Sequence, residues 1–208
     1  MLALIQARSN SRRFKNKILC HIFEKSLIEH VIDSVKKSNK IKKIVVATSV
    51  NKSDRKLVYF LKKKKINFYK GNLNNVALRL VNAAKKNNAK FFLRVNADSP
   101  LIDYTLINKA INIHRKNISS DLITNVFPRT FPSGQSIEII RTDVLAQNIK
   151  FMSKDEKEHV SKYFYKYNTK FFIKNFKCTP NYKYKHLKKM TIDYKSDIKK
   201  IKHLINEN

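Results

Sequence analysis

A short polar loop near the start of the chain contains the residues best suited to chemistry. An apolar run at residues 2–5 leads into segment 8–17, which is rich in arginine, lysine, serine and asparagine. The N–H groups and hydroxyls of such a loop can donate hydrogen bonds to phosphate oxygens, while the cations neutralise the charge. The segment has no glycine, so it matches neither GxxxxGK[ST] nor GxGxxG. It therefore predicts a polyphosphate site of another type, with a basic solvated loop after an edge strand as the alternative.

Two aspartates could complete such a site with a metal ion. Asp98 follows a run dense in aromatic and β-branched residues at 90–96, and Asp193 closes a second β-rich run before a helix that begins near Ser196. A carboxylate at a strand end leaves room for phosphate oxygens and water around Mg²⁺. If the two carboxylates converge, we expect Mg²⁺ between them, because two unshielded carboxylates repel each other. An Asx turn or a helix cap is the alternative for Asp98.

The first half of the chain alternates between strand and helix patterns. Ser26 and Glu29 form a capping-box pattern in front of apolar residues at helical spacing. Such an alternation predicts a parallel α/β sheet, in which ligands bind at the carboxyl ends of the strands. The polar loop lies at such an end. The expected strands are 2–5, 43–49, 66–69 and 90–96, and the expected helices are 26–37, 53–63 and 76–84.

The second half is less regular. Segment 127–134 holds two of the four prolines and one of the two glycines, and we interpret it as a substrate loop or a dimer arm, so that a homodimer is open. Glu138 lies in an apolar strand pattern and needs a cationic partner or a function. A lone histidine such as His159 is more often structural than catalytic. The expected helices are 106–116, 154–167 and one from Ser196, and the expected strands are 121–125, 137–140 and 171–177, the last antiparallel.

Bulk properties limit the class of protein. The 208 residues suffice for one domain spanning 1–208, and 42% hydrophobic content argues against disorder. The net charge of +30 would suggest nucleic acid, but the lysines are scattered, in a composition poor in glycine and proline. We therefore expect no specific nucleic-acid binding and keep a basic nucleic-acid-binding protein as the alternative. Two distant cysteines and the lack of an apolar run near 18 residues predict a cytoplasmic protein without a leader or membrane segment.

Several of these segments together resemble the cytidylyltransferases that activate acidic sugars. The closest likeness is to the spore coat polysaccharide biosynthesis protein F group, with CMP-sialic acid and CMP-KDO synthetases as relatives. The family pattern A-R-x-x-S-x-R-[LF]-x-x-K is matched by Ala7, Arg8, Ser11, Arg13, Phe14 and Lys17. Further blocks, in the family's order, lie at 71–76, 94–103, 132–138, 158–161 and 190–198. The chain departs from the pattern at Asn10 and Asn16, where glycine is usual, at Lys15 in place of proline, and at Ser99 in place of cysteine.

The resemblance implies an α/β, three-layer Rossmann-like nucleotide-diphospho-sugar transferase fold with a mixed, mostly parallel central sheet. It implies transfer of CMP from CTP to an acidic sugar of the nonulosonic acid or KDO type, with pyrophosphate released, in surface polysaccharide biosynthesis. The alternatives are another base specificity or a glycosyltransferase on the same fold. The resemblance implies catalytic roles for Arg13, Lys17, Asp98 and Asp193, the last two as Mg²⁺ ligands. It implies that the nucleotide is bound by Ala7, Arg8, Ser11, Gly71, Asn72 and Asn75. It implies that the sugar substrate is bound by Gly134, Glu138 and His159. For residues 71–76 a simple strand-to-helix turn is the alternative.

Overall fold

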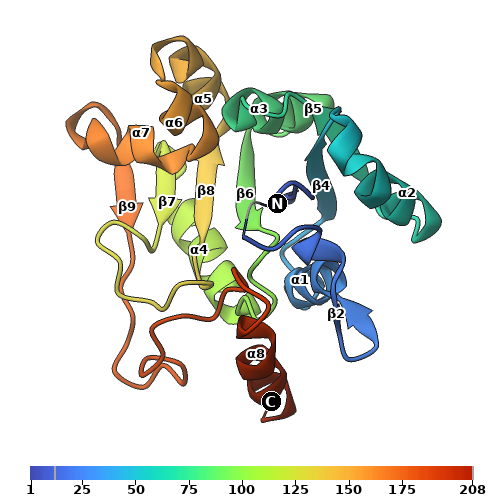
Figure 1. The fold of residues 1–208 in the computed structure, drawn as a ribbon. Helices are drawn as coiled ribbons and strands as arrows, with labels where there is room; N and C mark the ends of the chain where they lie inside the picture. Colours follow the sequence, from blue (N-terminus) through green and yellow to red (C-terminus); the bar gives the residue numbers. More distant parts are fainter. Residues whose placement is uncertain (12, 208) are drawn as a thin grey trace.

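A seven-stranded sheet forms the centre of the protein in a computed structural model that describes residues 1–11 and 13–207 (Figure 1). The strands run in the order β5-β4-β1-β6-β8-β7-β9, and β8 alone is antiparallel to its neighbours. The expected mixed, mostly parallel sheet is therefore confirmed. The strands are β1 (Leu2–Gln6), β4 (Lys43–Ser49), β5 (Phe68–Gly71), β6 (Phe91–Asn96), β7 (Leu122–Thr124), β8 (Glu138–Arg141) and β9 (Ile173–Asn175).

The register of the three central strands brings their carboxyl ends to one edge. Gln6, the last residue of β1, lies opposite Ala47 of β4 and Asn96 of β6. The chain continues the pairing for one more residue on each side: the Ala7 N–H donates to the Ala47 carbonyl, and the Ala97 N–H donates to the Gln6 carbonyl, both at 3.1 Å. The polar loop after β1 and the segment holding Asp98 after β6 therefore start side by side.

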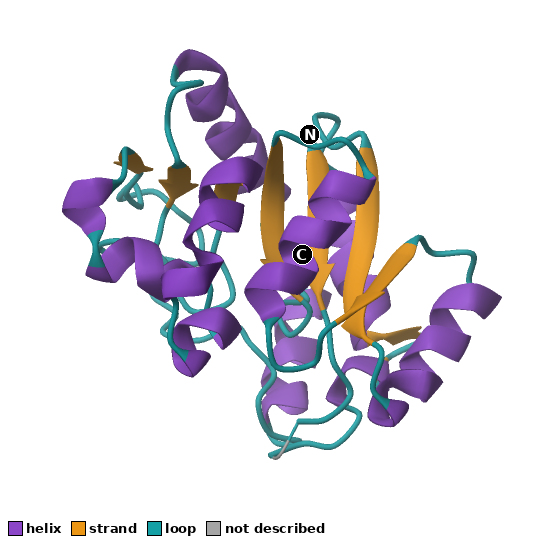
Figure 2. Cartoon of the chain, turned by 90° about the horizontal axis from the view of Figure 1, so that it is seen from above, coloured by secondary structure: helices purple, strands orange, loops and turns teal. Residues whose placement is uncertain are grey.

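Helices cover both faces of the sheet, which gives three layers (Figure 2). Alternation along β1 explains this, because Ala3 and Ile5 face one helical layer while Leu2 and Leu4 face the other. The first layer consists of α1 (Leu27–Lys36), α2 (Arg55–Lys63) and α4 (Tyr104–Lys116). The second contains α3 (Val76–Lys86), α5 (Thr142–Asn148), α6 (Lys154–Glu158) and α7 (Ser161–Lys166). Four 3₁₀ turns among the described residues connect these elements: Lys17–Leu19, Lys52–Asp54, Ile149–Phe151 and Asn168–Lys170.

A third apolar cluster ties the end of the chain to its beginning. Helix α8 (Asp197–Asn206) packs Ile201 and Leu204 against Ile22, which lies in the small hairpin of β2 (His21–Ile22) and β3 (Lys25–Ser26). Ile192 belongs to the same cluster. The C-terminal segment is thereby held beside the loop that follows β1.

Three sequence-based expectations are wrong. The helix expected at 154–167 is two helices, separated by His159 and Val160, because His159 leaves the helical conformation with φ −104° and ψ 67°. Strand β9 pairs parallel to β7 rather than antiparallel, since the intervening helices return the chain to the starting edge of the sheet. Residues 190–194 form no sheet strand; their apolar members Met190 and Ile192 pack into the third cluster instead.

Candidate active site

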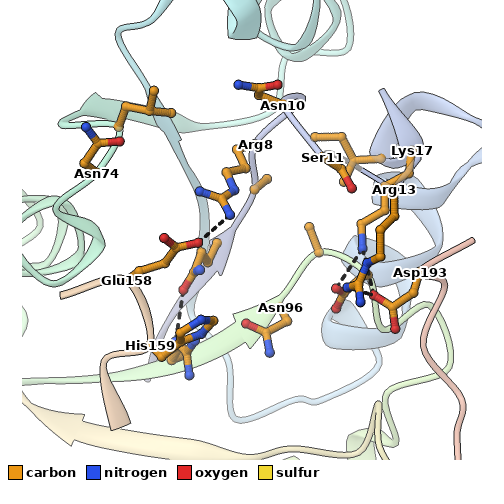
Figure 3. Close-up of a pocket in the computed structure, with 17 residues that line it drawn as sticks. Arg8, Asn10, Ser11, Arg13, Lys17, Asn74, Asn96, Glu158, His159 and Asp193 are labelled. Atoms are coloured by element: carbon orange, nitrogen blue, oxygen red, sulfur yellow. Dashed lines mark hydrogen bonds and ion pairs between the residues drawn. The ribbon is translucent and has the colours of Figure 1, made fainter. Parts of the chain in front are cut away.

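A polar cavity of about 760 Å³ lies at the carboxyl ends of β1 and β6 (Figure 3). Its walls come from the loop after β1, the ends of both strands, the turn before α3, the break between α6 and α7, and the C-terminal segment. Among the described residues, those that line it are Gln6, Ala7, Arg8, Asn10, Ser11, Arg13, Lys17, Ile18, Leu73, Asn74, Arg94, Asn96, Ala97, Asp98, Glu158, His159 and Asp193.

The loop after β1 folds back on itself without any glycine. The N–H groups of Ser11 and Asn16 both donate to the Ser9 carbonyl, at 3.0 and 3.1 Å. Asn16 adopts a left-handed conformation with φ 57°, which asparagine tolerates better than most residues. Buried Asp54 anchors the loop to β4: it accepts the Ser9 N–H at 2.6 Å and also accepts the N–H and the hydroxyl of Ser49. The turn therefore forms although asparagine stands where related loops carry glycine.

Lys17 lies between the two predicted metal ligands. Its Nζ donates to Asp98 Oδ2 at 3.0 Å and to the carbonyl of Ile192 at 2.8 Å, and it lies 3.6 Å from Asp193 Oδ1. The residue is 9% exposed, so this ammonium is held by its protein partners rather than by solvent. The expected convergence of Asp98 and Asp193 is present, with a lysine between them.

Asp193 is held from several sides. Arg13 Nη2 contacts its Oδ1 at 2.8 Å, and Lys189 Nζ lies 3.2 Å from Oδ2. Its N–H donates to Asp197 Oδ2 at 2.7 Å. Burial opposes ionisation of Asp193, but the hydrogen bond from Lys189 and the nearby charges of Lys17, Lys189 and Arg13 outweigh it and lower the pKa. The carboxylate is therefore ionised at neutral pH.

A second ion pair lies at the other end of the cavity. Arg8 Nη2 contacts Glu158 Oε1 at 2.5 Å, and both side chains remain more than a third exposed. His159 lines the cavity next to Glu158, with its Nε2 3.8 Å from Asp155 Oδ1. Figure 3 shows Arg13, Lys17 and Asp193 grouped at one end, with Glu158, His159 and Asn74 towards the other. The break between α6 and α7 thus brings Glu158 and His159 to the cavity.

Gly71, Asn72 and Asn75 are not among the residues lining the cavity, whereas the intervening Leu73 and Asn74 are. Asn72 Oδ1 accepts the N–H groups of Asn74 and Asn75, at 2.9 and 2.8 Å, and Asn75 caps α3 by accepting the Leu78 N–H. Their side chains shape the strand-to-helix turn. A direct contact of Asn72 and Asn75 side chains with nucleotide is not supported by this geometry.

Gly134 and Glu138 also lie outside the cavity lining. Gly134 has φ 100°, and a Cβ there would come within 2.9 Å of the Met190 backbone, so the glycine lets the C-terminal segment pass. Glu138 forms an ion pair with Arg94 and accepts a hydrogen bond from the Tyr165 hydroxyl at 2.7 Å. Burial opposes its ionisation, yet the charge of Arg94 lowers its pKa. Glu138 is therefore a paired buried carboxylate that reaches the cavity only through Arg94, which lines it.

Three polar residues near strand ends line the cavity although none was among the predicted site residues: Gln6, Arg94 and Asn96. Gln6 and Asn96 end β1 and β6, and Arg94 Nε donates to Gln6 Oε1 at 3.0 Å. Their position at the carboxyl end of an expected strand was the available signal. Asn74 and Glu158 were not predicted as site residues either, although they lie in the matched blocks 71–76 and 158–161; a turn and a helix break bring them to the cavity.

The aspartate pair fits magnesium rather than a metal with an all-protein ligand set. The described residues contain no group of three or more His, Cys, Asp and Glu that could hold a metal. Mg²⁺ takes one or two carboxylates and completes its octahedron with phosphate oxygens and water. Asp98 and Asp193 meet that requirement, because both contact one side-chain ammonium and face the cavity.

A mostly parallel α/β sheet with a polar cavity at the carboxyl ends of its strands has the arrangement of a nucleotide-binding enzyme. A sequence model described as cytidylyltransferase matches residues 2–208, so the chain belongs to the cytidylyltransferase family and transfers CMP from CTP. No described helix has the length and apolar character needed to cross a membrane.

Three known proteins illustrate the likeness. A cytidylyltransferase structure from Leptospira borgpetersenii superposes with a TM-score of 0.90 at 27% identity, covering 100% of this chain and 87% of that one. The structure of CMP:2-keto-3-deoxy-manno-octonic acid synthetase complexed with CTP has a TM-score of 0.74 at 17% identity, over 99% and 98% of the chains. The spore coat polysaccharide biosynthesis protein SpsF of Bacillus subtilis is 24% identical over 211 residues, 98% of this chain and 85% of that protein.

Proposed function

We propose that the acceptor of the CMP group is an acidic sugar of the nonulosonic acid or KDO type, and that the product serves surface polysaccharide biosynthesis. The cluster of Lys17, Asp98 and Asp193 at one end of the cavity, with Arg13 on its solvent side, supports the transfer of a nucleotidyl group, and the choice of acceptor rests on the relatives. The printed names of the two more distant relatives, one a synthetase acting on an eight-carbon acid sugar and one a polysaccharide protein, point to the same acceptor class.

The triphosphate would lie along the loop after β1. Arg13 and Lys17 are placed to neutralise its oxygens, and the Ser11 hydroxyl lines the same wall. The acceptor hydroxyl would lose its proton to solvent, and its oxygen would form a bond to the α-phosphorus. The bond from the α-phosphorus to the oxygen that bridges to the β-phosphorus would break, and pyrophosphate would leave. Positioning and charge neutralisation are what the site provides.

Asp98 and Asp193 would hold Mg²⁺ together with the phosphate oxygens. Magnesium bound there would polarise the α-phosphate and lower the pKa of the acceptor hydroxyl. Lys17, which contacts both carboxylates in the structure, would then exchange part of these contacts for phosphate oxygens. Arg8 is paired with Glu158 through Nη2, and its partly exposed guanidinium has further N–H donors that would serve the nucleotide.

Pyrophosphate release against a panel of substrates tests the proposal. We expect release with CTP and Mg²⁺ in the presence of KDO or a nonulosonic acid, and little with UTP, ATP or GTP. Release only with neutral sugars or sugar phosphates would overturn the acidic acceptor. Turnover of a nucleotide sugar without pyrophosphate formation would favour a glycosyltransferase instead.

A further inference from the structure

Arg79 is a buried arginine that the proposed reaction does not use. It lies in α3, is 0% exposed, and its Nη1 donates to the carbonyl oxygens of Asn72 at 2.8 Å and Leu73 at 3.4 Å. Within the described residues its Nε and Nη2 have no hydrogen-bond partner. Burial lowers the pKa of Arg79 to about 10, so the side chain remains a cation at neutral pH. A buried charge held by two backbone carbonyls depends on the position of those carbonyls.

Gly71 makes the space in which this side chain lies. A Cβ at residue 71 would come within 2.8 Å of Arg79 Cγ and 3.1 Å of Arg79 Cβ, and within 3.0 Å of Tyr69 Cε1. Those atoms are near the backbone end of the arginine, so it could not swing away without losing its hydrogen bonds. The glycine is therefore explained by the close approach of Arg79.

The carbonyls that Arg79 holds belong to a wall of the cavity. Leu73 and Asn74 line it, and Figure 3 shows Asn74 far from Lys17 and Asp193. If the triphosphate occupies the cationic end, as the proposed function requires, the neutral nucleoside lies towards Leu73 and Asn74. These are an apolar and an amide side chain, which suit a base better than a phosphate.

We propose that Arg79 is a positioning residue that holds residues 72–74 in the conformation that receives the nucleoside of CTP. The inference rests on the proposed placement of the triphosphate. Movement of the turn away from α3 would leave a buried guanidinium without its carbonyl partners, which is costly. The turn therefore has its binding conformation before the nucleotide arrives. Nucleotide binding then loses no free energy to ordering the turn.

Calorimetric titration with CTP and with inorganic tripolyphosphate tests this without any acceptor sugar. Arg79→Met should weaken CTP binding about tenfold and leave tripolyphosphate binding within about twofold of wild type. Lys86→Met, which removes an exposed cation from the same helix, is the matched control and should change neither. A folded Arg79→Met protein with unchanged CTP affinity, or with equal losses for both probes, would overturn the inference. Wild-type protein that binds CTP no more tightly than tripolyphosphate would contradict the nucleoside site itself, and the inference with it.

Gly71→Ala provides a second route that leaves the arginine in place. The added methyl should displace Arg79 and also weaken CTP binding selectively. In an Arg79→Ala background the same change should cost less CTP affinity, because the nearest atom, Arg79 Cγ at 2.8 Å, is gone, although the contacts with Tyr69 Cε1 and the Cβ of residue 79 remain. Fully additive losses, or a Gly71→Ala protein that binds CTP like wild type, would overturn the coupling between the two residues and the inference with it.

Discussion

At the scale of single residues, the central feature of the cavity is an ammonium shared by two carboxylates. Without a cation, Asp98 and Asp193 would repel each other, and removing one charge would stabilise the fold. The positive charge of Lys17 already offsets the negative charges of both aspartates. Arg13 and Lys189 contribute further positive charge beside Asp193. Neutralising either aspartate should therefore bring no gain in stability.

Asp98→Asn and Asp193→Asn should each lower kcat by at least about a hundredfold, because in the proposed reaction each aspartate supplies charge that holds Mg²⁺ beside the triphosphate. Melting temperatures should stay near that of wild type or fall slightly, since both side chains are partly exposed. The checks are steady-state pyrophosphate release and thermal unfolding in parallel. Near-normal turnover in either variant would rule out the aspartate from the reaction.

Lys17 and Arg13 should behave differently although both are cations of the same loop. The Lys17 side chain is 11% exposed and that of Arg13 is 57% exposed. Lys17→Ala leaves two carboxylates without their shared partner and should cost about 1–3 kcal/mol of unfolding free energy. Arg13→Ala should cost less than about 1 kcal/mol. Both should weaken CTP binding, which titration measures; equal destabilisation by the two variants would contradict this reading of their burial.

At the scale of elements, the start of α1 shows how a local sequence signal fixes an element. Ser26 and Glu29 form the capping box that the sequence predicts, and Glu29 also contacts Lys64 at 2.8 Å. Burial opposes ionisation of Glu29, but hydrogen bonds from Lys64 and Ser26 lower its pKa from 4.5 to about 2. A carboxylate with a lowered pKa stabilises the fold above its unfolded pKa and loses that contribution as pH falls through its folded pKa.

Glu29→Gln should therefore reduce the loss of stability between pH 4.5 and about 2. At pH 7 the variant should be less stable than wild type, and the two should converge towards pH 2. Urea unfolding at several pH values measures this, with Glu24→Gln, an exposed residue of the nearby hairpin, as the control. A constant difference between variant and wild type across this range would show that the charge of Glu29 does not contribute.

Elements with a strong local pattern were predictable from the sequence, and those defined by distant partners were not. Strand β4 spans Lys43–Ser49, the range expected from its run rich in β-branched residues. The direction of β9 is set by β7, about fifty residues earlier, and no periodicity encodes it. The apolar residues at 190–192 alternate as in a strand, but their partners are helix α8 and the hairpin after the loop. Helix α5 was not expected, since its seven residues give too short a pattern.

The residues of the candidate site also fall into those that the sequence could identify and those that it could not. Lys17, Asp98 and Asp193 were identifiable because their types suit phosphate and metal chemistry and because they lie in segments that match the family pattern. Gly71 and Gly134 were noticed because glycine is rare in this chain. The structural reason for each is a close neighbour that leaves no room for a Cβ: Arg79 beside Gly71 and the Met190 backbone beside Gly134. Such an approach depends on three-dimensional packing. Arg79 itself had no recognisable signal in the sequence.

At the scale of the whole molecule, the net charge of +30 is spread over exposed lysines on most elements. Binding to duplex DNA or RNA should therefore be weak and should fall steeply with salt. Replacing Lys62, Lys63, Lys64 and Lys65 with glutamine should lower this affinity without changing CTP affinity. Filter binding at two salt concentrations checks the expectation. A sequence-selective complex that survives about 200 mM salt would contradict it.

The contacts that hold the C-terminal segment beside the loop after β1 affect the order in which the site assembles during synthesis of the chain. Ile192, whose carbonyl accepts a hydrogen bond from Lys17, lies 175 positions later in the chain. All strands of the sheet precede it, so on the ribosome the sheet can emerge while Lys17 and Asp98 still lack their last partners. A nascent chain that has released residues up to about 180 carries the loop but not Asp193. Lys17 therefore gains its contact with Ile192 only after the strands of the sheet have been synthesised, and chains that stop before Asp193 should lack the activity proposed for this residue.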